Sequence, residues 1–197
     1  RIGFASIINK SILITIALAY PMIAGLLILA EPLTLIFCGA EYIDAIPVLH
    51  WNAPVIILIS LTNVMGIQIL YPQNKVNIVI ISTTAGALIN LTLNLYLIPK
   101  YSATGAAIAT LIAEFAVLMT QIALGRKYFP FNLSIIIKNH YILCTIAMSI
   151  CIYTILHFCD TTTSQLIFGT IGGIIIYGIW LILFKDKLEI IHTIIKR

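Results

Sequence analysis

The fold is decided by one stretch of the sequence, Asn90-Leu-Thr-Leu-Asn94-Leu-Tyr-Leu-Ile-Pro99-Lys-Tyr-Ser-Ala-Thr-Gly105-Ala-Ala-Ile-Ala-Thr110-Leu-Ile-Ala-Glu114. It predicts an apolar helix that ends at Pro99, a short turn, and a second apolar helix that begins near Gly105, because proline lacks the N–H that a helix interior needs. Two asparagines and one carboxyl group lie deep in these helices. Polar groups in such helices are expected to face protein or water rather than lipid.

The composition is that of a membrane protein. Of the 197 residues, 61% are hydrophobic and 9% are charged, and the mean hydropathy is +1.09, whereas about 25% of residues in soluble domains are charged. Several apolar runs are long enough to cross a hydrocarbon core of about 30 Å as helices, and they are too uniformly apolar for barrel strands. The sequence therefore predicts an all-α polytopic membrane protein with six transmembrane helices, at about 11–30, 48–70, 76–98, 103–125, 140–158 and 164–184.

The basic residues gather on one side of the predicted membrane. One side holds ten of the eleven Lys and Arg residues, and the other holds only Lys100, together with Glu31, Glu41, Asp44 and Asp160. Cytoplasmic connectors carry an excess of Lys and Arg, so both ends of the chain are predicted to face the cytoplasm, and the net charge of +4 is no signal for nucleic acid. The ten are Arg1, Lys10, Lys75, Arg126, Lys127, Lys138, Lys185, Lys187, Lys196 and Arg197.

The longest cytoplasmic connector divides the chain into two predicted parts. Residues 1–127 hold four spans, and residues 128–197 hold two additional spans and a cytoplasmic tail. Pro21 lies at the centre of the first span and is predicted to kink it, as a tolerated irregularity or as a hinge in a moving half. Because residue 1 is Arg rather than Met, the chain is expected to be the carboxy-terminal piece of a longer protein.

The third and fourth spans each carry a polar face. At about 100° per residue, the polar and small residues of the third span fall within about a third of its circumference. The third-span face comprises Thr83, Gly86, Ala87, Asn90 and Asn94. The fourth-span face comprises Thr110, Glu114, Val117 and Gln121, and the side expected to meet lipid comprises Ile108, Ile112, Phe115, Met119 and Ile122.

Glu114 lies about 11 residues into the fourth span, near the bilayer midplane. A charge at that depth costs several kcal/mol unless it is paired, hydrated or protonated. Two interpretations stay open. Glu114 is either a neutral acid bonded to Thr110 or to a third-span asparagine, or a cavity-lining group that exchanges protons or meets substrate.

Enzyme and metal chemistry have no support in the sequence. The four cysteines include no C-x-x-C spacing, the four histidines are scattered, and neither a phosphate-binding loop nor a nucleophile–base pattern occurs. No catalytic residue, metal or cofactor is therefore predicted, and coupling to protons or sodium is left open.

The opening stretch also resembles a known family. Leu97-Ile-Pro99-Lys-Tyr101-Ser-Ala-Thr-Gly105-Ala-Ala-Ile-Ala-Thr110, preceded by Asn90-x-x-x-Asn94, is similar to the carboxy-terminal half of bacterial polysaccharide flippases in the multidrug, oligosaccharidyl-lipid and polysaccharide exporter superfamily. The family commonly has Tyr-Gly where this chain has Tyr101-Ser102. Three other stretches fit the same pattern, Tyr20-Pro-Met-Ile-Ala-Gly25, Ile36-Phe-Cys-Gly39-Ala-Glu-Tyr42 and Gly66-Ile-Gln-Ile-Leu70-Tyr-Pro-Gln-Asn-Lys75.

The resemblance implies a fold and a function. It implies that the chain forms two trailing helices and most of the second lobe of a protein with two six-helix lobes. It also implies that the first lobe, which holds most of the pyrophosphate-binding cations, is missing here. Such proteins flip polyprenyl-pyrophosphate-linked oligosaccharides, the repeat units of O-antigen or capsule, across the bacterial inner membrane by alternating access. The implied partners are that lipid-linked oligosaccharide, membrane lipid and other polysaccharide assembly proteins. Asn90, Asn94, Thr110, Glu114 and Gln121 are the residues expected to line the cavity.

Two other functions remain under consideration. A cation-coupled multidrug exporter of the same superfamily would also use a buried acid such as Glu114. A membrane enzyme of polysaccharide assembly is disfavoured, since such enzymes are expected to carry a large outer loop with Arg or His and the outer connectors here are short and acidic.

Overall fold

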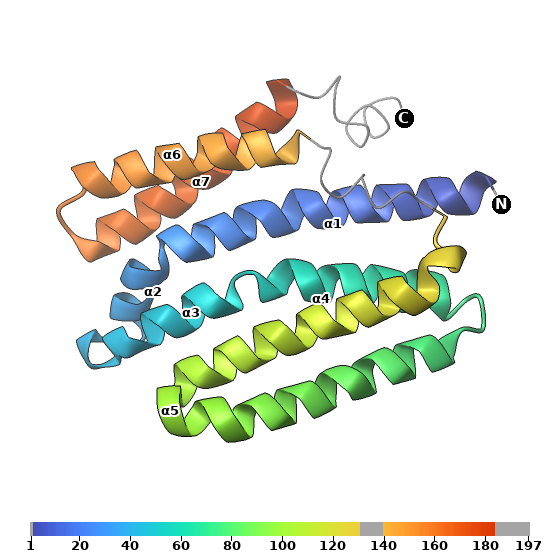
Figure 1. The fold of residues 1–197 in the computed structure, drawn as a ribbon. Coiled ribbons are helices and arrows are strands. Elements are labelled where there is room, and N and C mark those ends of the chain that lie inside the picture. The colour runs from blue at the N-terminus through green and yellow to red at the C-terminus, as the bar shows by residue number, and fades with distance from the viewer. Residues whose placement is uncertain (1, 131–139, 184–197) are drawn as a thin grey trace.

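The computed structural model describes residues 2–130 and 140–183 and confirms the all-α prediction (Figure 1). Most of the 128–140 connector and the predicted cytoplasmic tail lie outside the described residues. The helices run in chain order as α1 (Ile2–Ile28), α2 (Ala30–Phe37), the short turn η1 (Ala40–Ala45), α3 (Ile46–Asn52), α4 (Val55–Asn63), the π-helical segment η2 (Val64–Leu70), α5 (Val76–Gly125), the turn η3 (Arg126–Tyr128), α6 (Tyr141–Phe158) and α7 (Thr162–Leu183).

The first predicted span is longer than expected and is interrupted near its end. Helix α1 begins well before residue 11 and passes through Pro21 without ending there. The interruption comes at Leu29, whose backbone angles of φ −94° and ψ 9° separate α1 from α2. Helix α2 then stops before Gly39, whose φ of +93° favours glycine, and the amide N–H of Gly39 donates to the carbonyl of Thr34 at 3.1 Å.

The second predicted span is broken in two. Helices α3 and α4 meet at Ala53 and Pro54, and the axis bends by 41° at this break. The physical reason is Pro54, which has no N–H to donate and whose ring crowds the preceding turn. Beyond α4 the chain widens into η2, where the Tyr71 N–H donates to the carbonyl of Gly66, five residues earlier, at 3.0 Å.

Helix α5 is a hairpin rather than one straight rod. Its two arms, 76–101 and 103–125, run antiparallel and meet at Ser102, whose φ of +49° and ψ of −131° are not helical (Figure 1). Pro99 weakens the helix one turn earlier. Gly105 allows the arms to close tightly, because a Cβ on Gly105 would lie 2.3 Å from the carbonyl oxygen of Leu97. The turn predicted between Pro99 and Gly105 is therefore confirmed.

The positive φ of Ser102 leads to a testable prediction. Ser102→Gly is expected to raise the free energy of unfolding by about 1 kcal/mol, because a serine side chain is strained in this region and glycine is not. The measurement is a denaturant titration of the purified chain in detergent, followed by circular dichroism. Ser164→Gly, in the first turn of α7, is the control and is expected to be destabilising, so a loss of stability in both variants would contradict a strained turn at Ser102.

The number of membrane crossings is confirmed only in part. Four described helices are long and apolar enough to span a membrane, and five if the bent pair Ala40–Asn52 and Val55–Leu70 counts as one span. The predicted six counts the two arms of α5 separately, and it stays a prediction.

Helices α6 and α7 form a second hairpin that packs on α1 and α2. Their boundaries agree closely with the predicted spans at 140–158 and 164–184. The Tyr177 hydroxyl donates to the carbonyl of Ala17 at 2.7 Å and so joins α7 to α1. Gly169 and Gly173 bring α7 close to its neighbours, since a Cβ on either would lie 2.9 Å from Leu29 or Ile152.

Helix α1 lies between the α6–α7 hairpin and the remaining helices (Figure 1). Its buried face, with Ile12 and Ile16, packs against Val64 and Ile69 of η2 and against Tyr141 of α6. A separate cluster of Leu61, Met65 and Leu118 joins α4 and η2 to the second arm of α5. The first arm of α5 lies outermost, beyond the second arm (Figure 1).

Candidate functional site

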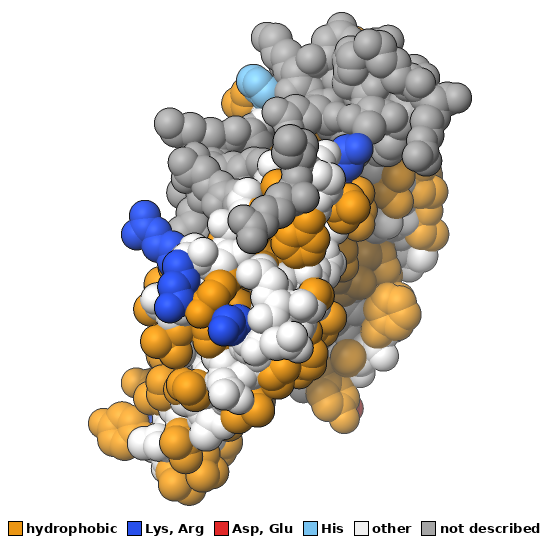
Figure 2. Space-filling view, turned by 90° about the vertical axis from the view of Figure 1, so that its right-hand side faces the viewer, with side chains coloured by type: hydrophobic (Ala, Val, Ile, Leu, Met, Phe, Trp, Pro, Cys, Tyr) orange, Lys and Arg blue, Asp and Glu red, His pale blue; other side chains and the backbone are white. Residues whose placement is uncertain are grey.

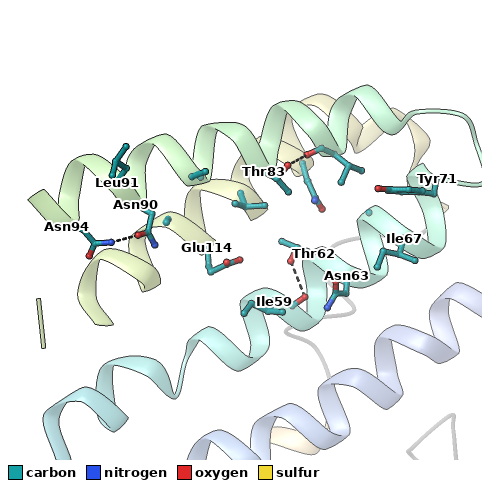
Figure 3. Close-up of a pocket in the computed structure, with 17 residues that line it drawn as sticks. Ile59, Thr62, Asn63, Ile67, Tyr71, Thr83, Asn90, Leu91, Asn94 and Glu114 are labelled. Atoms are coloured by element: carbon teal, nitrogen blue, oxygen red, sulfur yellow. Dashed lines mark hydrogen bonds between the residues drawn. The ribbon is translucent and has the colours of Figure 1, made fainter. Parts of the chain in front are cut away.

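A cavity of about 650 Å³ opens between α4, η2 and the two arms of α5 (Figure 3). It is open to the outside, because Asn63, Thr83 and Leu91 are exposed as well as lining it. Its lining residues are Ile59, Thr62, Asn63, Gly66, Ile67, Tyr71, Val79, Thr83, Gly86, Ala87, Asn90, Leu91, Asn94, Ala113, Glu114, Val117 and Gln121.

The first arm of α5 contributes the polar face that the helical period predicts. All five residues of the predicted third-span face, Thr83, Gly86, Ala87, Asn90 and Asn94, line the cavity. The side-chain amide of Asn94 donates to the Oδ1 atom of Asn90, one turn earlier, which fixes the orientation of both amides (Figure 3). The Thr83 hydroxyl donates to the carbonyl of Val79 at 2.9 Å and so is satisfied within its own helix.

The second arm contributes the carboxyl group and a buried amide. Glu114 points into the middle of the cavity, across from Thr62 and Asn63 of α4 (Figure 3). Within the described residues it forms no hydrogen bond to Thr110 or to either asparagine. Gln121 is only 2% exposed, and its Nε2 atom lies 3.5 Å from the position that a Cβ on Gly66 would take. The glycine in η2 thus makes room for this amide.

Two predicted functional residues lie elsewhere. Thr110 is not among the lining residues, and its hydroxyl donates to the carbonyl of Ala106 at 3.0 Å within the same helix. Pro21 lies inside α1, which does not line the cavity. Its role as a hinge remains a prediction.

The wall formed by α4 and η2 was not predicted from the sequence. This wall contributes Thr62, Asn63 and Tyr71 to the cavity lining. The signal that could have found this wall is the spacing of Ile59, Asn63 and Ile67, which follow one another at intervals of four residues and therefore share one side of a helix.

The chemistry of the lining favours an uncharged polar ligand or a cation. Glu114 is the one ionisable carboxyl group among the lining residues, and none of them is Lys, Arg or His. Asn94 Oδ1 and Gln121 Oε1 are buried and accept no hydrogen bond within the described structure, so each oxygen has an unused capacity to accept one. No group of three His, Cys, Asp or Glu side chains that could hold a metal ion occurs among the described residues.

Comparison with known proteins gives one distant similarity. The chain is 30% identical over 135 residues to the lipid II flippase MurJ of Bacillus subtilis (strain 168). The match covers 67% of this chain and 25% of that protein, so the chain corresponds to about a quarter of the length of the relative it matches. No family model matches the sequence, and no solved structure matches it.

Proposed function

We propose that this chain is part of a transporter that flips a lipid-linked saccharide across the bacterial cytoplasmic membrane. The observation that carries the proposal is the cavity of about 650 Å³, which combines an amide pair on one arm of α5 with Glu114 and Gln121 on the other. Side-chain amides both donate and accept hydrogen bonds, as sugar hydroxyls do. The similarity to a lipid II flippase supports a lipid-linked substrate.

The substrate proposed in more detail is a polyprenyl-pyrophosphate-linked oligosaccharide, such as an O-antigen or capsule repeat unit. The saccharide occupies the cavity while the polyprenyl chain stays in lipid, and alternating access carries the polar head across without covalent chemistry. Both ends of this chain face the cytoplasm, in keeping with the ten-to-one distribution of Lys and Arg. A further lobe of the same protein completes the pathway.

A second candidate function is a cation-coupled drug exporter. The specific observation in its favour is Glu114, a carboxyl group without a described hydrogen-bond partner in a cavity whose described lining holds no basic residue. A cationic drug or a coupling cation would be attracted to such a group.

The test is export by the intact gene in a bacterial host that lacks its own polysaccharide flippase. Restored surface polysaccharide is expected, and Asn90→Ala is expected to lower its amount about ten-fold, since losing a hydrogen bond to a buried polar partner costs about 1–3 kcal/mol. Leu95→Ala, on the same arm but 73% exposed and outside the lining, is the matched control and should export normally.

One outcome would contradict a lipid-linked substrate, and another would contradict a role for Glu114 in export. Transfer of resistance to cationic drugs without polysaccharide export would favour the drug exporter. Unchanged export by Glu114→Gln would remove Glu114 from the working residues, although the cavity and its amides would stand.

A further inference from the structure

A cluster of basic and aromatic side chains lies at one end of the cavity, outside its lining. The Nζ atoms of Lys75 and Lys127 each lie 5.1 Å from the centroid of the Tyr128 ring. Both ammonium groups thus approach the same aromatic side chain, and Arg126 directly precedes Lys127 in the chain. Lys75, Arg126, Lys127 and Tyr128 together form what we call the phosphate cluster.

The phosphate cluster is held in place by the surrounding fold. The side-chain amide of Gln73 donates to the carbonyl of Tyr128 at 3.1 Å and so joins the connector before α5 to the one after it. Phe129 anchors the second connector, because its ring packs against Gly125 and on two separate hydrophobic clusters. Two connectors that are about 50 residues apart in the sequence therefore present one fixed group of cations.

The same two connectors border the cavity. Lys75 follows the lining residue Tyr71 by four residues, and Arg126 follows the lining residue Gln121 by five. Both connectors lie at the end of the molecule where the N-terminus lies (Figure 1). Figure 2 looks onto this end and shows Lys and Arg side chains gathered beside apolar ones. The phosphate cluster therefore follows shortly after the last lining residue of each of the two segments.

The described carboxyl groups leave these cations without an internal counterion. Glu31, Glu41 and Asp44 lie in α2 and η1, and Asp160 lies between α6 and α7, all at the opposite end of the bundle (Figure 1). Glu114 points into the cavity. The positive charge of the phosphate cluster is therefore available to an anionic ligand, as far as the described residues show.

We infer that the phosphate cluster binds the diphosphate of a membrane-anchored, lipid-linked saccharide while the sugar enters the cavity. This inference rests on the proposed function and assigns a second contact to the same substrate. The two ammonium groups of Lys75 and Lys127 suit a diphosphate, which carries two charges, better than the single charge of a phosphodiester, and the Tyr128 hydroxyl supplies a further donor. The position at the end of the helices matches the depth of a lipid headgroup, with the hydrocarbon chain beside the helices.

The test uses the 197-residue chain reconstituted in phosphatidylcholine nanodiscs, with a sugar-free polyprenyl diphosphate as the probe and native mass spectrometry as the readout. The double variant Lys75→Gln/Lys127→Gln is expected to bind the probe about 25-fold more weakly, at about five-fold for each lysine. Lys75→Arg/Lys127→Arg keeps both charges and is expected to bind within about three-fold of the parent, which excludes misfolding as the cause.

Lys100→Gln is the matched control. Lys100 also lies over a tyrosine ring, with its Nζ atom 3.8 Å from the centroid of Tyr96, but at the opposite end of the α5 hairpin. This variant should bind the probe as the parent does. Equal losses in Lys100→Gln and in the double variant, or no loss in the double variant, would overturn the assignment. Equal displacement of the probe by phosphatidylglycerol would also overturn it, because the cluster would then only attract anionic lipid.

A saccharide-bearing form of the probe separates this inference from the proposed function. If the sugar adds no affinity and Asn90→Ala has no effect, while the lysines still govern diphosphate binding, the inference stands and the proposed cavity function fails. If Asn90→Ala weakens binding of the saccharide-bearing lipid and the lysine variants do not, the function stands and the inference is overturned.

Discussion

Gly105→Ala is expected to lower the free energy of unfolding by about 3 kcal/mol or more, the largest effect on stability that the structure predicts. The new Cβ would lie 2.3 Å from the Leu97 carbonyl oxygen and 2.6 Å from its carbon. These are backbone atoms, so no side chain can move aside, and the two arms of α5 would have to separate at their turn. Denaturant titration in detergent, followed by circular dichroism, measures the loss.

The matched controls for Gly105 are Gly25→Ala and Gly178→Ala. Both glycines lie within helices where an added Cβ would meet nothing within 4 Å. Alanine favours a helix over glycine by about 1 kcal/mol, so these variants are expected to be neutral or slightly stabilising. A Gly105→Ala chain as stable as these controls would show that the arms do not meet as closely as described.

Gly86→Ala is expected to impair both stability and the cavity, and Val117→Ala is expected to rescue it. A Cβ on Gly86 would lie 2.3 Å from Cγ2 of Val117 on the facing arm. The arms would be pushed apart, at a cost of about 1–3 kcal/mol, in the middle of the lining. Removing the two methyl groups of Val117 relieves this contact and leaves the 3.3 Å approach to the Ala113 carbonyl oxygen, so the double variant should regain most of the lost stability.

A double-mutant cycle measures this compensation, with the unfolding free energy of each single variant and of the pair. The expected coupling between positions 86 and 117 is about 1–2 kcal/mol and favourable. Gly86→Ala combined with Ile112→Ala, whose side chain is 42% exposed on the same arm as Val117, is the control and should give additive effects. Additive effects for Gly86 and Val117 as well would contradict direct contact between the arms.

The arms of α5 could be predicted from the sequence because one physical rule governs them. A helix with 3.6 residues per turn places residues three or four apart on one side, so the polar residues from Thr83 to Asn94 mark the cavity wall. The same rule placed Glu114 and Gln121 in the cavity, and it placed Ile112, Phe115 and Met119 on an exposed side of the second arm. Pro99 marked the turn through its missing N–H.

The remaining features depend on contacts between distant segments. Thr110 shares a helical face with Glu114 by spacing alone, but the cavity does not extend to it, because its extent is set by α4 and η2. The break at Pro54 falls within a run that hydropathy treats as one span, since hydropathy is insensitive to backbone hydrogen bonds. The π-helical segment has no sequence signature of its own. Ser102 stands where the polysaccharide flippases that this stretch resembles commonly have glycine. Its φ is positive, and glycine adopts such a φ without strain, which explains the preference for glycine at this position.

In the π-helical segment η2, the number of residues between α4 and α5 decides which side chains face α1 and which face the cavity. Hydrogen bonds in such a segment join residues five apart, so Val64 and Ile69 both reach the α1 core, while Gly66 and Tyr71 both reach the cavity. In an α-helix, residues five apart would point about 140° away from each other. Removing one residue from η2 would therefore turn either the face that packs on α1 or the face that lines the cavity away from its partner. The length of η2 thus allows the segment to contact the core and the cavity at the same time.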